Sequence, residues 1–122
     1  MRYMMLIKHS EDYSNIEIPR SLYEVMGAFI GQARKNGTYI DGAGLQPMSA
    51  GHRVRLRSGK ITVTDGPFTE TKEIIGGYAL IEAKSEAEAL TIAKQFMDLH
   101  RIHWPTHECE CEVRPLAAQE KK

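Results

Sequence analysis

The chain has 122 residues, a length typical of one domain, and such a domain buries roughly two thirds of its unfolded surface without disulfides or metals. Sixteen basic residues balance sixteen acidic ones, so the composition argues against nucleic acid or an anionic membrane as a partner. No apolar run approaches membrane-spanning length, and the first residues are too few and too polar for a signal peptide. We therefore expect a cytoplasmic single domain at 1–116 and a loose tail at 117–122.

The first half of the chain alternates strand and helix patterns. Residues 2–9 predict a strand that is apolar on both faces. Residues 21–37 predict a helix with an apolar stripe, which a capping box of Ser21 and Glu24 would start and Gly37 would stop. Residues 38–47 then predict a short strand that runs into a glycine-rich loop.

The second half continues the alternation. Residues 52–64 predict a hairpin that turns at Ser58-Gly59 and alternates apolar side chains with arginines. A long strand at 73–83 follows. Residues 85–103 predict a second helix, which a capping box of Ser85 and Glu88 would start. Its expected apolar stripe consists of Leu90, Ala93, Phe96 and Met97. Residues 107–115 predict a last strand.

The two cysteines, Cys109 and Cys111, are separated by one residue in the last predicted strand. Neighbours on one face of one strand are poorly placed for a disulfide, and such a bridge would constrain almost nothing. We expect both to be reduced thiols, which agrees with a cytoplasmic location.

The element order β-α-β-(ββ)-β-α-β predicts an α+β sheet with both helices on one face. Helices can cover only that face, whereas the first strand and the end of the long strand are apolar on both sides. A second copy, packed sheet against sheet, is the simplest cover for the remaining face. We therefore expect a homodimer through the face that bears Tyr3, Met5 and Ile7, or through its opposite.

A specific motif follows the hairpin. Asp65-Gly66-Pro67-Phe68 precedes Glu70, Lys72, Glu73 and the run Gly76-Gly77-Tyr78, and together they resemble the signature of the YCII-related family in its DGPF branch. The resemblance extends to residues 3–9, 99–105 and 112–116, so it covers essentially the whole chain. It implies a ferredoxin-like dimeric α/β barrel. Members are proposed to be enzymes because they are similar to small isomerases and dehalogenating enzymes with this barrel, and some relatives are associated with sigma-factor-like regulators.

The predicted topology brings separate residues to one rim. The end of the first strand, His9, should lie beside the start of the long strand, and the second helix should carry His100 and His103 to the same edge. His9 and Asp65 are the catalytic candidates, since a carboxylate partner would orient the imidazole and raise its pKa. The candidates for binding a substrate or lining its pocket are Glu70, Lys72, Glu73, His100 and His103.

Each signal also has a purely structural interpretation. The DGPF motif has the residues of an elaborate turn, and Gly76-Gly77 is typical of a bulge or a close backbone approach. The histidines near residue 103 form no closed metal-binding signature, so we expect neither a metal nor another cofactor. The arginines of the hairpin suit a solvated face or an anion site and, without interleaved aromatic residues, do not indicate nucleic acid.

Two functions are compatible with these residues. The first is a cofactor-independent enzyme that uses acid–base chemistry on a small molecule, of the isomerase or lyase type. The second is a non-catalytic ligand-binding or regulatory module, associated with a sigma-factor-like regulator, in which the same rim recognises a metabolite or a protein.

Overall fold

The computed structural model describes residues 1–9, 17–68 and 73–117, so residues 118–122 of the predicted tail lie outside the described part. The expected order of helices and strands is confirmed. The elements are β1 (Arg2–His9), α1 (Arg20–Lys35), β2 (Tyr39–Gly44), a 3₁₀ turn (Met48–Ala50), β3 (His52–Arg57), β4 (Lys60–Asp65), β5 (Ile74–Glu82), α2 (Glu86–His103) and β6 (Cys109–Pro115). Within the described ranges, neither α-helix has the length and apolar character needed to cross a bilayer.

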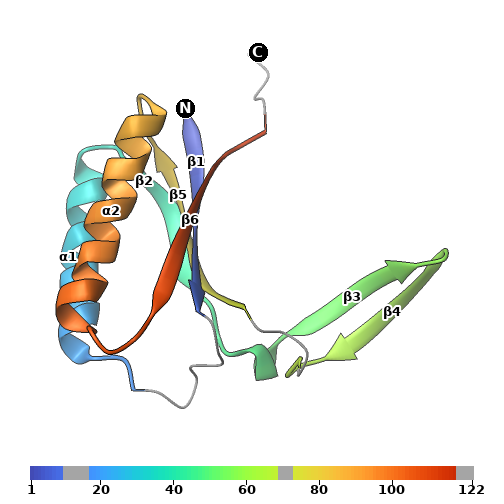
Figure 1. Ribbon diagram of the computed structural model, residues 1–122. Coiled ribbons are helices and arrows are strands. Elements are labelled where there is room, and N and C mark those ends of the chain that lie inside the picture. Colours follow the sequence, from blue (N-terminus) through green and yellow to red (C-terminus); the bar gives the residue numbers. More distant parts are fainter. Residues whose placement is uncertain (10–16, 69–72, 118–122) are drawn as a thin grey trace.

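The main sheet has the strand order β2-β5-β1-β6, and every neighbouring pair is antiparallel. Both helices cover one face of this sheet, and the β3–β4 hairpin projects from the other side (Figure 1). This α+β arrangement is compatible with a ferredoxin-like fold. As expected, the end of β1 lies beside the start of β5, since His9 pairs with Ile74.

The core lies between the sheet and α2. Tyr3 and Met5 point from β1 towards the helices and are 3% and 2% exposed. They pack in one cluster with small residues of α2, Ala89 and Ala93, which allow the helix to approach the sheet closely. The predicted stripe of α2 was wrong at one position, because Leu90 is 43% exposed and Ala89 takes the buried place.

Because Tyr3 and Met5 lie under the helices, the sheet face left uncovered is the opposite one. Its centre carries four half-buried apolar side chains, which we call the open-face strip: Met4, Leu6, Tyr78 and Leu80. Cys109 and Cys111 of β6 are free and half-buried, as predicted, and burial raises the pKa of Cys111 to about 11.

The two helix starts differ. The backbone N–H of Glu88 donates to Ser85 Oγ at 3.1 Å, so the predicted cap of α2 is confirmed. The predicted box of Ser21 and Glu24 is wrong, because α1 begins one residue earlier, after Pro19, with no side-chain cap. At the other end of α1, Gly37 adopts a φ of +82° and stops the helix as expected.

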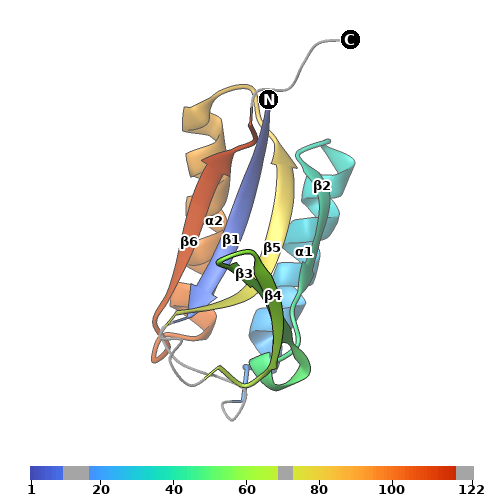
Figure 2. The ribbon, with the colours of Figure 1, turned by 90° about the vertical axis from the view of Figure 1, so that its right-hand side faces the viewer.

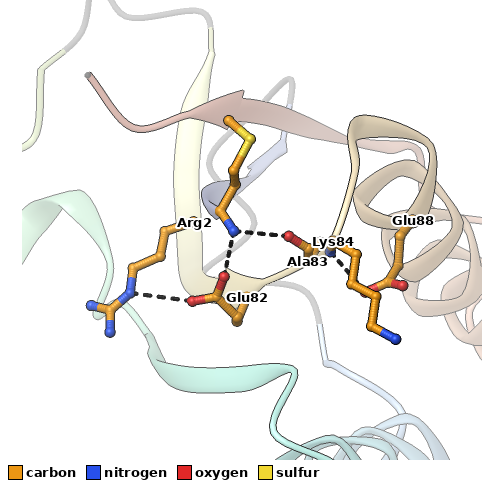
Figure 3. A network of polar contacts seen from close by, with 6 residues as sticks. Arg2, Glu82, Ala83, Lys84 and Glu88 are labelled. Atoms are coloured by element: carbon orange, nitrogen blue, oxygen red, sulfur yellow. Dashed lines mark hydrogen bonds and ion pairs between the residues drawn. The ribbon is translucent and has the colours of Figure 1, made fainter. Parts of the chain in front are cut away.

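Polar contacts fasten the first residue of the chain to the end of β5, where α2 begins (Figure 3). The Met1 amine donates to the Ala83 carbonyl at 3.0 Å and contacts the Glu82 carboxylate. The backbone N–H of Lys84 donates to the side chain of Glu88 at 3.1 Å, next to the Ser85 cap. This network holds together the end of the sheet that lies farthest from His9.

Candidate functional site

A cavity of about 750 Å³ lies between α1 and the sheet. Its walls are mainly apolar, and they include Ile7, Leu22, Met26, Phe29, Ile81 and Phe96. A volume of this order suits a small organic molecule, and a mostly apolar wall with a few polar groups is the usual composition of such a site.

A group of aromatic side chains closes one end of the cavity, and we call it the histidine cluster: His9, His100, Trp104 and His107. His9 reaches it because the alternation of β1 turns its side chain towards the helices, and His100 and Trp104 come from the end of α2. His9, His100 and Trp104 line the cavity and are each less than a tenth exposed. His107 lies behind them, with its ring stacked on Trp104 at a centroid distance of 3.9 Å.

Hydrogen bonds fix the orientation of these imidazoles. His9 Nδ1 lies 2.7 Å from His107 Nε2, so one of the two nitrogens donates a proton to the other. His100 Nδ1 lies 3.1 Å from the Phe96 carbonyl oxygen, which can only accept. Neutral His100 therefore carries its proton on Nδ1 and a lone pair on Nε2.

The electrostatics of the cluster keep its imidazoles neutral. Burial, followed by the neighbouring His107 and His100, lowers the pKa of His9 to about 4. Burial also lowers the pKa of His100, against the effect of its bond to the Phe96 carbonyl. The pKa of His107 is lowered by burial as well, and Glu108 acts in the opposite direction. At neutral pH the cluster therefore offers N–H donors and lone pairs, without positive charge.

The partner expected for His9 lies elsewhere in the chain. Asp65 ends β4 on the hairpin, and its Oδ1 lies 2.8 Å from Nδ1 of His52 at the start of β3. Both side chains are exposed, Asp65 at 82%. The expected direction of the pKa shift was wrong: the pKa of His9 is lowered rather than raised, chiefly by burial and then by His107 and His100.

The remaining candidates separate into three groups. Glu73 forms an ion pair with Lys8 at 3.3 Å, on the sheet face opposite His9. His103 is the last residue of α2 and is not among the residues that line the cavity. Glu70 and Lys72 lie outside the described residues. His9 and His100 are thus the two predicted residues that the fold brings together at the cavity.

The DGPF motif forms the base of the hairpin. The N–H of Gly66 donates to the Gly51 carbonyl at 2.9 Å, and a Cβ on Gly66 would lie 1.9 Å from the Met48 carbonyl oxygen. No larger residue fits there. Phe68 lies under the guanidinium of Arg53, 4.2 Å from it. The motif therefore forms a tight turn, in agreement with the structural interpretation of its sequence.

The paired glycines serve the sheet as predicted. The register of β5 against β1 shifts between Ile7 and Lys8, which leaves Gly76 as the extra residue of a bulge. A Cβ on Gly77 would lie 3.1 Å from the Ala43 carbonyl of β2, so the neighbouring strand approaches closely. Both glycines shape the sheet wall of the cavity.

Four residues of this site were not among the predicted catalytic and binding residues, although His107 is one of the histidines considered above as possible metal ligands. Trp104 and His107 complete the histidine cluster, and the available signal was their position beside His103 in a stretch with the only tryptophan of the chain. The other two, Arg34 and Tyr39, line the far end of the cavity, where the guanidinium lies 4.8 Å from the ring centroid. Burial raises the pKa of Tyr39, with Arg34 acting in the opposite direction, so its phenol stays a donor.

Among the side chains in the described ranges, no group of three or more His, Cys, Asp or Glu is arranged to hold an ion.

Comparison with known proteins places the chain. The YCII-related domain matches residues 1–96, which include His9 and the DGPF motif and end before His100. An uncharacterised protein of Rhizobium meliloti (strain 1021) is 43% identical over 75 residues, 62% of this chain. The aligned part spans 56% of that relative's length. With more than half of its residues matched, the chain belongs to the YCII-related domain family.

Proposed function

We propose that the cavity binds a small apolar molecule and that His9 transfers a proton to and from it, without a cofactor. The reaction would be an isomerisation or an elimination. The observation that supports this most is the position of two buried, neutral imidazoles at the closed end of an apolar cavity. Titratable groups with strongly shifted pKa values beside a cavity are typical of functional sites.

The chemistry follows from the bond between His9 and His107. If His9 Nδ1–H donates to His107 Nε2, the lone pair of His9 is on Nε2 and can accept a proton from carbon or oxygen of the ligand. The imidazolium is unfavourable in these buried surroundings, where the pKa of His9 is about 4. A negative charge developing on the ligand would raise that pKa and stabilise the ion pair in surroundings of low dielectric. Returning the proton to another atom completes an isomerisation.

The ligand that fits best is apolar and carries one acidic group. Tyr39 pairs with Ile81 and His9 with Ile74, so the two polar ends of the cavity lie at opposite ends of β5. Arg34 supplies the positive charge and Tyr39 a hydrogen-bond donor at one end, which suits a carboxylate or phenolate. At the other end of the cavity, the neutral histidine cluster would face the reacting part of the ligand.

The proposal also includes the family branch, the location and the assembly of the protein. Residues 1–116 form one cytoplasmic domain of the DGPF branch, and two copies associate through the uncovered sheet face as a dimeric α/β barrel. A direct role in the same site for Asp65, Glu70, Lys72, Glu73 and His103 stays a prediction.

The binding step can be tested with 8-anilinonaphthalene-1-sulfonate, an apolar aromatic probe with one anionic group. A Met26→Trp variant narrows the cavity, because Met26 lines it from α1. We expect the fluorescence titration to show at least about tenfold weaker binding, whereas Gln32→Trp on the exposed side of α1 should bind as wild type does. Equal weakening in both variants would contradict binding in the cavity.

The catalytic step separates the proposal from its alternative. Transfer of a ligand C–H proton to His9 allows exchange with solvent, so NMR in D₂O should detect deuterium uptake into a small lactone with wild type but not with His9→Gln. A pKa of His9 near 4 lies well below the optimum for a general base at neutral pH. The low pKa therefore favours the alternative function, a non-catalytic ligand-binding module associated with a sigma-factor-like regulator. Binding of the ligand without deuterium uptake would support this alternative.

A further inference from the structure

The β3–β4 hairpin has an apolar face with no cover. Its strands form a separate two-stranded sheet that reaches away from the rest of the molecule (Figure 1). Four large apolar side chains share one face and are 64–70% exposed: Val54, Leu56, Ile61 and Val63. They pair across the strands as Val54 with Val63 and Leu56 with Ile61, so the face is continuous. An apolar patch of this kind on a projecting element indicates a protein interface.

The direction of the hairpin is set at its base. His52 pairs with Asp65, Arg53 packs on Phe68, and the Gly66 N–H donates to the Gly51 carbonyl. Its tip is a tight turn, in which Ser58 and Gly59 both have positive φ. Held in this way, the hairpin stands on the side of the sheet that the helices leave uncovered, in front of β1 and β5 (Figure 2).

The charges of the chain identify the occupant. Residues 52–65 contain four basic residues and one acidic residue, whereas the rest of the chain contains twelve basic and fifteen acidic residues. The three arginines of the hairpin lie on the face opposite to its apolar side chains, so their charge acts at longer range: a positively charged arm and a negatively charged body attract each other, which favours a second copy as the partner. The open-face strip of that copy is apolar and equally uncovered, so it offers a matching surface.

We propose that the apolar face of the hairpin docks on the open sheet face of a second copy of this chain. In a two-fold dimer the contact occurs twice, and each molecule clasps the other with one arm. This inference rests on the sheet-face homodimer of the proposed function and adds the arm to it. The arm also explains why the hairpin needs a rigid base, since a clasp that pivoted freely would lose more entropy on docking.

Sedimentation velocity over a concentration series tests the arm directly. Leu56→Thr with Ile61→Thr places a β-branched strand former at both positions but removes apolar area four times per dimer, so we expect the dimer dissociation constant to rise about 100-fold or more. Thr62→Ser on the opposite face is the matched control and should leave it within about twofold. Both variants change exposed side chains, so their circular dichroism spectra should match that of wild type, which shows that the fold is kept.

Three outcomes would overturn the inference. The first is a double variant that dimerises like wild type, which would show that the hairpin does not contribute to the dimer. If a Leu6→Thr variant then dissociates, the proposed sheet-face dimer stands and only the proposal of the hairpin arm fails. The second is equal hydrogen exchange of the hairpin amides in monomer and dimer, since docking must protect them. The third is a wild-type monomer whose arginine face instead binds a 20-base-pair DNA duplex with steep salt dependence, unaffected by the double variant.

Discussion

The buried histidine cluster makes a quantitative prediction about pH. The pKa of His9 is about 4 in the folded protein, against 6.5 for an ordinary histidine. Between these two values the unfolded chain binds more protons than the folded one, so the free energy of unfolding must fall as the pH falls through that window. From pH 7 to pH 5, His9 alone should remove about 2 kcal/mol, and about 3 kcal/mol in total below pH 4. His100 and His107 act in the same direction, because burial lowers the pKa of both.

The test compares wild type with His9→Gln in urea unfolding followed by far-ultraviolet circular dichroism. Glutamine cannot be protonated in this range but keeps a donor and an acceptor for His107. We expect its loss of unfolding free energy between pH 7 and pH 5 to be smaller than that of wild type by about 2 kcal/mol. Protein concentration must be held constant, since association shifts apparent stability.

His52→Gln provides the matched control. This histidine lies on the exposed hairpin, 63% exposed, so the acid-linked loss of stability should persist in that variant. Two results would refute the reasoning: a wild-type stability that is flat between pH 7 and pH 5, or a His9→Gln variant that loses as much as wild type. NMR titration of the His9 ring protons, with a midpoint near 6.5 rather than near 4, would do the same.

Three further predictions concern the turn and the caps. Ser85→Ala should lower the unfolding free energy by about 1 kcal/mol because it removes the cap of α2, whereas Ser21→Ala, which removes no cap, should cost less than about 0.5 kcal/mol in the same denaturation assay. Gly66→Ala should displace the hairpin from the 3₁₀ turn, and faster hydrogen exchange of the amides around Gly51 and Gly66 would detect the displacement. Gly59→Asn at the tip should leave that exchange unchanged. Asp65→Asn should weaken probe binding about tenfold if the carboxylate acts directly in the ligand site, and binding within about twofold of wild type would show that Asp65 only holds His52.

Local patterns in the sequence determined much of this protein. The spacing of apolar residues predicted both α-helices and the six strands of the described residues in the right order, since the 3.6-residue and two-residue periods depend only on residues close together in the sequence. Turn and cap residues acted just as locally, at Ser58-Gly59, at Gly37 and at Ser85. The DGPF run and its neighbours were enough to indicate the family.

The tertiary structure decided what depends on burial and on distant partners. A capping box at Ser21 failed because α1 starts one residue earlier, and Leu90 lies outside the core because the rotation of α2 is set by how closely its alanines approach the sheet. The pattern around His9 placed it at the right edge, but only packing against His107 and the end of α2 made it a neutral histidine. For Asp65, the register of the hairpin decided the partner: it pairs Asp65 with His52 across the two strands, where the sequence had suggested His9.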